Sequence, residues 1–189
     1  MALTRLGLNQ AINLATNVTG TLATSNLPNG SVLQVVSTTK TDTYSETISA
    51  RGTGSDITGL TATITPTSAS SKLLAYATLN TSRDGPHAYA NFIIHRDGSS
   101  ILVGDSAGSR LPVTVGDNLG VSSSTSMFNT FSFGQVDASS TSSTTFSLRL
   151  ENSGSSGSQT FYVNRSVTDT DANSFTRAIS TIMVMEVSA

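Results

Sequence analysis

The chain has 189 residues, a net charge of −2 and no cysteine; 12% of its residues are charged, while nearly a third are serine or threonine. The charge balance and the lack of a basic stripe exclude an ordinary nucleic-acid-binding surface, and no apolar run approaches the ~20 residues that cross a membrane. The lack of cysteine excludes disulfides, thiolate metal sites and cysteine nucleophiles.

Residues 1–30 differ from the rest of the chain and are predicted to form an extended, partly helical N-terminal arm. A short helix is expected near Ala2–Ala15, and Pro28-Asn29-Gly30 is a strong turn signal that ends the arm. The aliphatic side chains that we assign to anchoring on another protein are Leu3, Leu6, Leu8, Ile12, Leu14 and Leu22. The alternative is a disordered leader, but so many large aliphatic side chains are unusual in a solvated tail.

The remaining residues, 31–189, are predicted to form one β-sandwich head domain. Short segments of alternating or β-branched residues recur between turn signals, and no helix pattern follows residue 30. The expected strands are 31–40, 42–49, 57–66, 72–80, 88–96, 100–105, 126–136, 145–151, 159–165 and 177–187. Such a series is typical of an all-β fold, an antiparallel β-sandwich of jelly-roll type.

Alternation along these strands predicts which side chains fill the core. The segment 145–151 shows the pattern most cleanly, because every second residue is large and apolar. The predicted core residues are Phe92, Ile94, Phe131, Phe133, Phe146, Leu148 and Leu150.

Two strands, 31–40 and 177–187, are apolar on both faces, and one sandwich core covers only one face. The apolar content of 37% also suggests that part of the stability comes from association with other chains. We therefore predict an oligomer interface formed by Leu33, Val35, Met183, Met185 and Val187. The alternative is that both strands are buried within a single chain.

The segment Gly104–Gly108 matches the G-x-S-x-G pattern of hydrolase nucleophiles, with Ser106 as the serine. The hydrolase order requires a histidine after the serine, but His87 and His95 both precede Ser106, and no helix pattern follows. We therefore expect Ser106 to lie in a loop without a catalytic role. Similarly, Asp97-Gly98 after His95 is predicted to be a hairpin turn, although His95-Arg96-Asp97 spells a kinase motif.

Asp169 and Asp171 resemble the opening of a calcium loop, but the glycine and glutamate that an EF-hand requires further along are absent. A polar loop before the last strand is the favoured interpretation, in which the Asp side chains bond nearby backbone amides. A loose calcium site remains the alternative. The chain's three glutamates include no evident glycosidase pair. No catalytic residue, metal site or cofactor is predicted.

Several segments resemble a Ser/Thr-rich β module of virion structural proteins of tailed bacteriophages. They read GSVLQVVSTTKTDTYSETI, ITGLTATITPTSASSKLLAYATLN, IIHRDGSSILVGDSAGSR and GSQTFYVNRSVTDTDANSFTRAISTIMVMEV. The segment NVTGTLATSNLP is similar to the linkers that precede phage fibre and decoration heads. The resemblance implies a non-enzymatic particle protein, often trimeric, with a jelly-roll-like head. In trimeric jelly rolls of the tumour-necrosis-factor type, the first and last strands lie together in the inner sheet.

From this resemblance we expect a virion-located homotrimer that decorates or cements the capsid and binds the major capsid protein, or another virion structural protein, through its arm. The alternative is a short tail fibre or receptor-binding protein of the same particle, with a host glycan as ligand. A glycan-acting enzyme is the least favoured class. Neither nucleic acid nor a membrane is an expected partner.

Overall fold

The computed structural model describes residues 26–84, 89–117, 127–154 and 157–189, and in them the chain forms strands and loops without an α-helix. The strands are β1 (Val32–Lys40), β2 (Tyr44–Ile48), β3 (Gly54–Ile64), β4 (Lys72–Arg83), β5 (Ala90–Arg96), β6 (Ser99–Ile101), β7 (Val115–Asp117), β8 (Phe128–Asp137), β9 (Thr144–Asn152), β10 (Gln159–Val163) and β11 (Ser180–Val187). All ten expected strands are present. The sequence missed only β7, because its three residues are too few to alternate.

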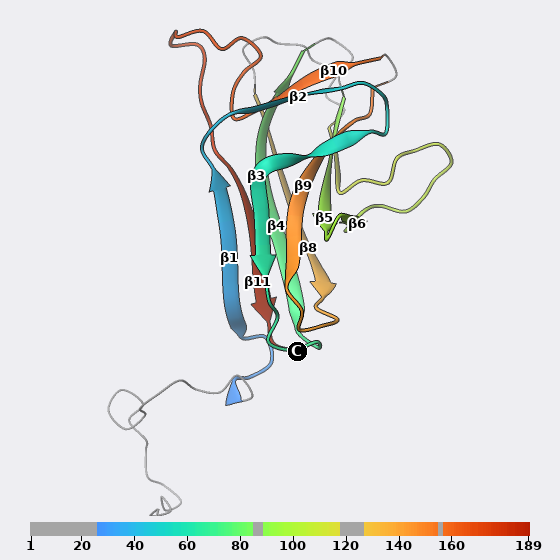
Figure 1. Cartoon of the computed structure of the whole chain (residues 1–189), viewed down its shortest axis with the longest axis vertical. Coiled ribbons are helices and arrows are strands. Elements are labelled where there is room, and N and C mark those ends of the chain that lie inside the picture. The colour runs from blue at the N-terminus through green and yellow to red at the C-terminus, as the bar shows by residue number, and fades with distance from the viewer. Residues whose placement is uncertain (1–25, 85–88, 118–126, 155–156) are drawn as a thin grey trace, which may run out of the picture.

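The strands form two antiparallel sheets (Figure 1). The first, here called sheet A, has the order β1-β11-β4-β10-β2, and β8 pairs with the other edge of β4. The second, sheet B, has the order β3-β9-β5-β6, and β7 pairs with β5 beside β6. The all-β prediction with antiparallel sheets is therefore confirmed. In the part of the chain that the structure describes, no helix is long and apolar enough to span a membrane.

A single apolar core lies between the two sheets. Sheet A supplies one face of β4 and of β11, and sheet B supplies the alternating residues of β9. Five predicted core residues are fully or almost fully buried, namely Phe92, Ile94, Phe146, Leu148 and Leu150. The alternation rule worked in these strands because each lies within a sheet that has one covered face.

Phe131 and Phe133 are not in the core, and that prediction was wrong. Their exposed fractions are 71% and 63%, so this face of β8 points outward. The inner face of β8 instead carries small residues, and Leu102 packs over Gly134 so closely that an added Cβ would lie 2.6 Å from a Leu102 methyl carbon. The alternation had correctly placed both phenylalanines on one face, but it does not specify which face is covered.

The turn at Pro28-Asn29-Gly30 is present and is tied to the other end of the chain. Gly30 has a φ of +87°, a conformation that glycine adopts without strain. Its amide donates to the Ser188 carbonyl at 2.9 Å, and the Ser188 hydroxyl donates to the Pro28 carbonyl at 3.0 Å. The predicted helix and the six anchoring aliphatic residues lie outside the described residues. The described chain therefore begins beside the C-terminal end of β11 (Figure 1).

Glu186 is a fully buried carboxylate that joins β1, β11 and the loop after β3. Its oxygens accept hydrogen bonds from the Gln34 side chain at 2.6 Å and from the amide and hydroxyl of Thr67, both at 2.8 Å. Burial opposes ionisation, but the hydrogen bonds outweigh burial and hold the pKa of Glu186 below its ordinary value.

Replacing Glu186 with glutamine should lower the free energy of unfolding at pH 7 by about 1–3 kcal/mol, because an amide nitrogen then faces hydrogen-bond donors. A lowered folded-state pKa stabilises the fold above the unfolded value of about 4.3, and this contribution is lost as the pH falls through the folded pKa. Urea titrations at pH 7, 4 and 3 should therefore show a steeper loss of stability in the wild type than in Glu186→Gln. Equal losses in both proteins would contradict this assignment.

Candidate self-association surface

The outer face of sheet A brings apolar side chains from four strands together. Directly paired residues of antiparallel strands point to the same face, so the register defines rows that cross β1, β11, β4 and β8. The rows are Val35–Met185–Leu74–Gln135, Ser37–Met183–Tyr76–Phe133 and Thr39–Thr181–Thr78–Phe131. Seven of these twelve residues are apolar, the others are Ser, Thr and Gln, and we call the three rows the apolar face.

The apolar face contains no charged residue. Its most exposed large apolar side chains are the two phenylalanines of β8 and Val35, which is 50% exposed. In the neighbouring row, which pairs Val187, Lys72 and Asp137, Lys72 forms an ion pair with Asp137. At the upper border, Asn129 donates a hydrogen bond to the Asn80 side chain at 3.1 Å. Exposed, contiguous apolar surface with a polar rim is typical of a protein interface.

Of the predicted interface residues, Val35, Met183 and Met185 lie on this face, and Val187 lies just below it, paired with Val32. Leu33 lies at a β-bulge between Val32 and Gln34, where the regular alternation is interrupted. The buried partners Ile182 and Val184 fill the core side of β11. Within the described residues, the last strand is thus fully covered on one face only.

Sequence reasoning missed the β4 and β8 side of the apolar face, which holds Leu74, Tyr76, Phe131 and Phe133. The signal was present in part, because the phenylalanines alternate with small residues and this pattern identifies a shared face. Among the described strands none pairs with the outer edge of β8, so this ten-residue strand also presents unpaired backbone groups.

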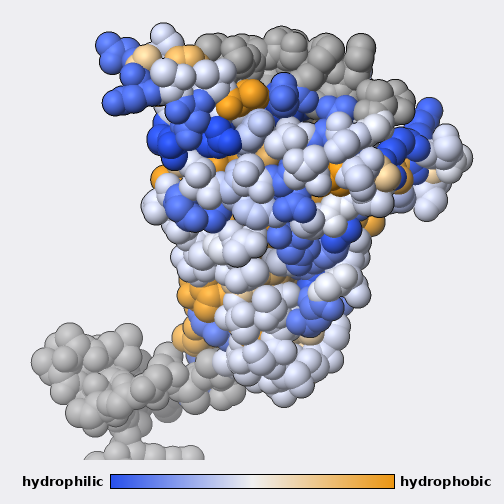
Figure 2. Space-filling model, turned by 45° about the horizontal axis from the view of Figure 1, so that its top comes forward, coloured by the Kyte–Doolittle hydropathy of each residue, from blue (hydrophilic) through white to orange (hydrophobic). Residues whose placement is uncertain are grey.

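On the side of the molecule that Figure 2 shows, the surface is mainly hydrophilic and hydrophobic colour is confined to small, separate areas. Threonine pairs such as Thr63 and Thr145 form hydrogen bonds across neighbouring strands, at 2.9 Å in this pair. The pairs Thr39–Thr181 and Thr47–Thr160 are joined across strands in the same way.

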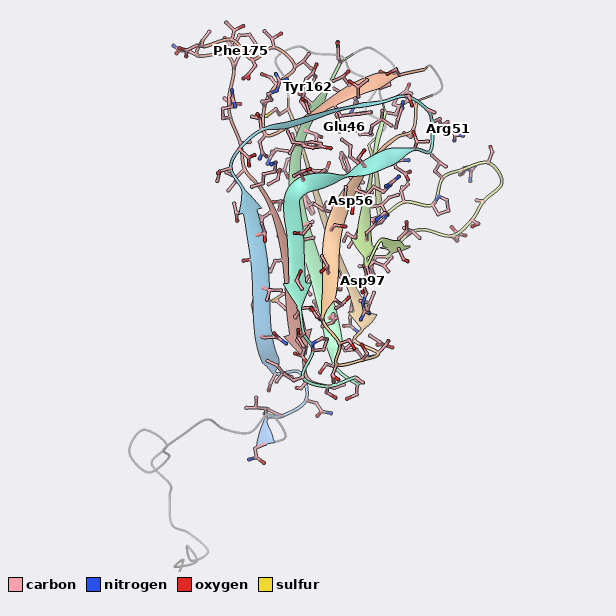
Figure 3. All side chains as sticks on the ribbon, in the orientation of Figure 1. Glu46, Arg51, Asp56, Asp97, Tyr162 and Phe175 are labelled. Carbon is pink, nitrogen blue, oxygen red and sulfur yellow. The ribbon has the colours of Figure 1, made fainter. Side chains whose placement is uncertain are left out.

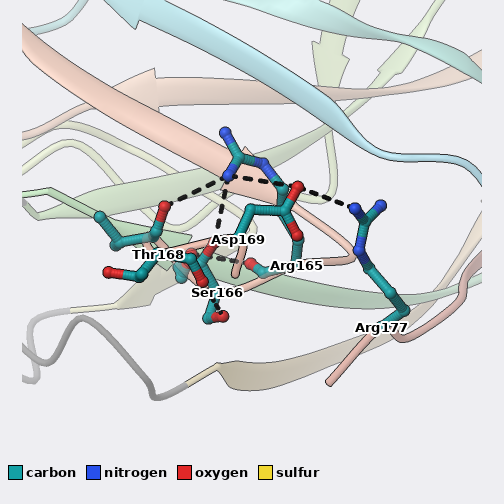
Figure 4. A network of polar contacts seen from close by, with 7 residues as sticks. Arg165, Ser166, Thr168, Asp169 and Arg177 are labelled. Carbon is teal, nitrogen blue, oxygen red and sulfur yellow. Dashed lines mark hydrogen bonds and ion pairs between the residues drawn. The ribbon is translucent and has the colours of Figure 1, made fainter. Parts of the chain in front are cut away.

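The loop before β11 lies at the end of the molecule opposite Gly30 and Ser188, and Phe175 marks its tip (Figure 3). Asp169 accepts a hydrogen bond from the Arg177 guanidinium at 2.8 Å and lies 3.8 Å from that of Arg165 (Figure 4). The predicted polar loop is therefore present, although Asp169 bonds arginines where backbone amides were expected. Within the described ranges no group of three or more His, Cys, Asp or Glu side chains is placed to hold a metal ion.

The two segments that match catalytic sequence motifs form a turn and a loop. Asp97 and Gly98 have φ values of 50° and 80° and join β5 to β6, which confirms the hairpin turn. Ser106 is exposed in the loop between β6 and β7. His95 instead contacts Asp56 and Ser100, and His87 lies outside the described residues.

No protein-family model matches the chain, and no curated protein matches it. Among solved structures, the chain is similar to one from infectious bursal disease virus, Gt strain, with 12% identity and a TM-score of 0.45 over 90% of this chain and 46% of that one. A chain from the Gx strain of the same virus gives 13% identity and a TM-score of 0.41 over 90% and 45%. This chain thus spans about half the length of those proteins. A likeness at this level assigns neither a family nor a function.

Proposed function

We propose that the protein is a virion structural protein that works as a homotrimer, with the apolar face of sheet A turned toward the neighbouring subunits. The observation that carries this proposal is the uncharged face itself, on which two phenylalanines are more than 60% exposed. Leaving such side chains in water costs about 25 cal/mol for each Å² of apolar surface, and a second copy of the chain would recover that free energy.

The strand order supports a jelly-roll assignment for the head. The first and last strands, β1 and β11, are neighbours in sheet A, followed by β4 and β8, and sheet B combines β3, β9, β5 and β6. This order agrees with what the phage-module resemblance implies. The resemblance supplies the virion context, and the apolar face supplies a surface for the trimer.

Within the particle we propose capsid decoration or cementing, with the N-terminal arm bound to the major capsid protein or to another virion structural protein. The described chain starts at the end where β11 finishes, and the loop before β11 lies at the opposite end (Figure 1). An arm attached at residue 30 would therefore direct that loop away from the anchor.

The same geometry favours a second candidate, a short tail-fibre head that binds a host glycan. Its loop before β11 contains a hollow of about 260 Å³ lined by Asp169, Thr170, Asp171, Ala172, Phe175 and Arg177. Carboxylate and guanidinium groups can form hydrogen bonds with sugar hydroxyls, and an aromatic ring can stack on the apolar face of a sugar ring. Glycan-array binding that is lost in Phe175→Ala and Asp171→Ala would favour this candidate, whereas imaging the protein on the capsid would favour decoration.

Light scattering of the isolated protein tests the trimer directly. We expect a mass of three chains at micromolar concentration, because the apolar face needs no other partner to be covered. A monomer that persists at high micromolar concentration would reject a trimer that forms independently of the particle.

Deleting residues 1–28 should leave a head that melts cooperatively and still self-associates, but that no longer joins the particle. The reason is that, in the described part of the chain, both sheets and their shared core consist of residues from Val32 onward. Thermal melting, light scattering and co-sedimentation with particles provide the three measurements. A truncated head that still assembles on particles would remove the arm from the anchoring role.

A further inference from the structure

On the outward side of sheet B, three polar side chains form an arrangement that the proposed structural role does not use. His95 of β5 lies between Asp56 of β3 and Ser100 of β6. Its Nδ1 is 3.3 Å from an Asp56 carboxylate oxygen, and its Nε2 is 3.2 Å from the Ser100 hydroxyl oxygen. Acid, imidazole and serine thus occur in series, as in serine hydrolases. Figure 3 marks the position of Asp56 on β3.

The chemistry of the partners determines the direction of both contacts. An ionised carboxylate only accepts hydrogen bonds, so the Nδ1 that faces Asp56 carries the proton of the neutral imidazole. Nε2 is then the acceptor, and the Ser100 hydroxyl donates to it. This is the tautomer in which a histidine removes a proton from a serine.

The burial of His95, the exposure of Ser100 and the hydrogen bond that holds Asp56 also suit the roles of base, nucleophile and acid. The His95 side chain is only 8% exposed, whereas Ser100 is exposed to solvent. Asp56 is held from β9, since the Ser147 hydroxyl donates to its second carboxylate oxygen at 2.7 Å. The acid, the base and the nucleophile therefore lie on strands of one sheet, where their positions are fixed by the register.

The geometry of the hairpin between β5 and β6 also places the Ser100 amide where it can donate a hydrogen bond to an oxyanion. Arg96 and Ser99 close the two-residue turn, so His95 and Ser100 form the next pair, which is not hydrogen-bonded between the strands. The Ser100 amide then points away from β5, and no described strand pairs with that edge of β6. The nucleophile's own amide is one of the oxyanion donors in serine proteases.

We propose that Ser100 is a nucleophile toward esters with short acyl chains, with His95 as general base and Asp56 as the residue that positions His95. The Ser100 oxygen forms a bond to the ester carbonyl carbon while its proton moves to Nε2 of His95. The carbon–alkoxide bond then breaks, and His95 returns the proton to the departing alcohol. In the second half, His95 removes a proton from water while the water oxygen forms a bond to the acyl carbon. The bond between that carbon and the Ser100 oxygen then breaks and His95 returns the proton to Ser100, which releases the carboxylic acid.

A short acyl group fits this setting because Ser100 is exposed on the outward side of sheet B, where a small substrate can reach its hydroxyl from solvent. The alcohol portion remains in solvent. This activity goes beyond the proposed structural role and departs from the sequence-based expectation of a non-enzymatic protein. Ser106, which the motif had singled out, takes no part in it.

The test is fluorophosphonate labelling of the full-length protein at pH 8, followed by mass mapping of the modified peptide. We expect an adduct on Ser100, its loss in Ser100→Ala, and a labelling rate at least about tenfold lower in Asp56→Asn, because an amide no longer imposes the productive tautomer. Ser99→Ala and Ser106→Ala serve as matched controls and should label like the wild type. Hydrolysis of p-nitrophenyl acetate should follow the same order.

An unmodified Ser100 in the wild type, or an adduct rate unchanged in Asp56→Asn, overturns the proposal. Melting curves of each variant verify the fold. Asp56→Asn is used in place of a His95 substitution because a change at the buried His95 would disturb the fold more. Light scattering reports the trimer separately, so failure of the triad and failure of the proposed structural function are distinguishable.

Discussion

Replacing Phe146 with alanine should lower the free energy of unfolding by about 3–5 kcal/mol, the range for deleting a buried phenylalanine side chain. Phe146 is fully buried between the sheets, and its backbone pairs with Ala62 of β3 on one side and Arg96 of β5 on the other. The ring cannot be replaced by a neighbouring side chain without moving these strands, so a cavity remains. Urea titration at neutral pH measures the loss.

Phe133→Ala is the matched control, because it removes the same atoms from a ring that is 63% exposed. Measured in the Met183→Asp background, where association is absent, it should change the free energy of unfolding by less than about 1 kcal/mol. A loss below about 1 kcal/mol for Phe146→Ala itself would place Phe146 outside the core.

Replacing Met183 with aspartate should convert the proposed trimer to a monomer that is still folded. Met183 lies on the apolar face between Ser37 of β1 and Tyr76 of β4, and its side chain is half-buried within a single chain. In the monomer the new carboxylate reaches water, but in the trimer it would be buried without a partner and cost several kcal/mol. Because each 1.4 kcal/mol is a factor of about ten, association should weaken by at least about 100-fold.

Light scattering over a concentration series, with circular dichroism to verify the fold, measures this effect. Met185→Asp should behave in the same way, since Met185 occupies the next row of the same face. Thr63→Asp, an exposed position on the outward side of sheet B, is the control and should remain trimeric. A trimer that tolerates both methionine substitutions would keep the oligomer but reject this face as its interface.

Much of the strand pattern was predictable because side-chain alternation is a local property. Ile182 and Val184 point opposite to Met183 and Met185 in any strand that contains them, and Asp97-Gly98 favours a tight turn wherever two strands flank it. Local chemistry was therefore sufficient to locate every strand except β7, the hairpin and the turn before β1.

Only the tertiary structure decided which face of each strand is covered and which distant residues meet. Phe131 and Phe133 share a face by alternation, but Leu102 fills the space on the other side of β8 and leaves the two rings outside. Asp56, His95 and Ser100 come together because β3, β9, β5 and β6 are neighbours in sheet B. Neither outcome can be read from sequence spacing, because strand register depends on the packing of all the strands at once.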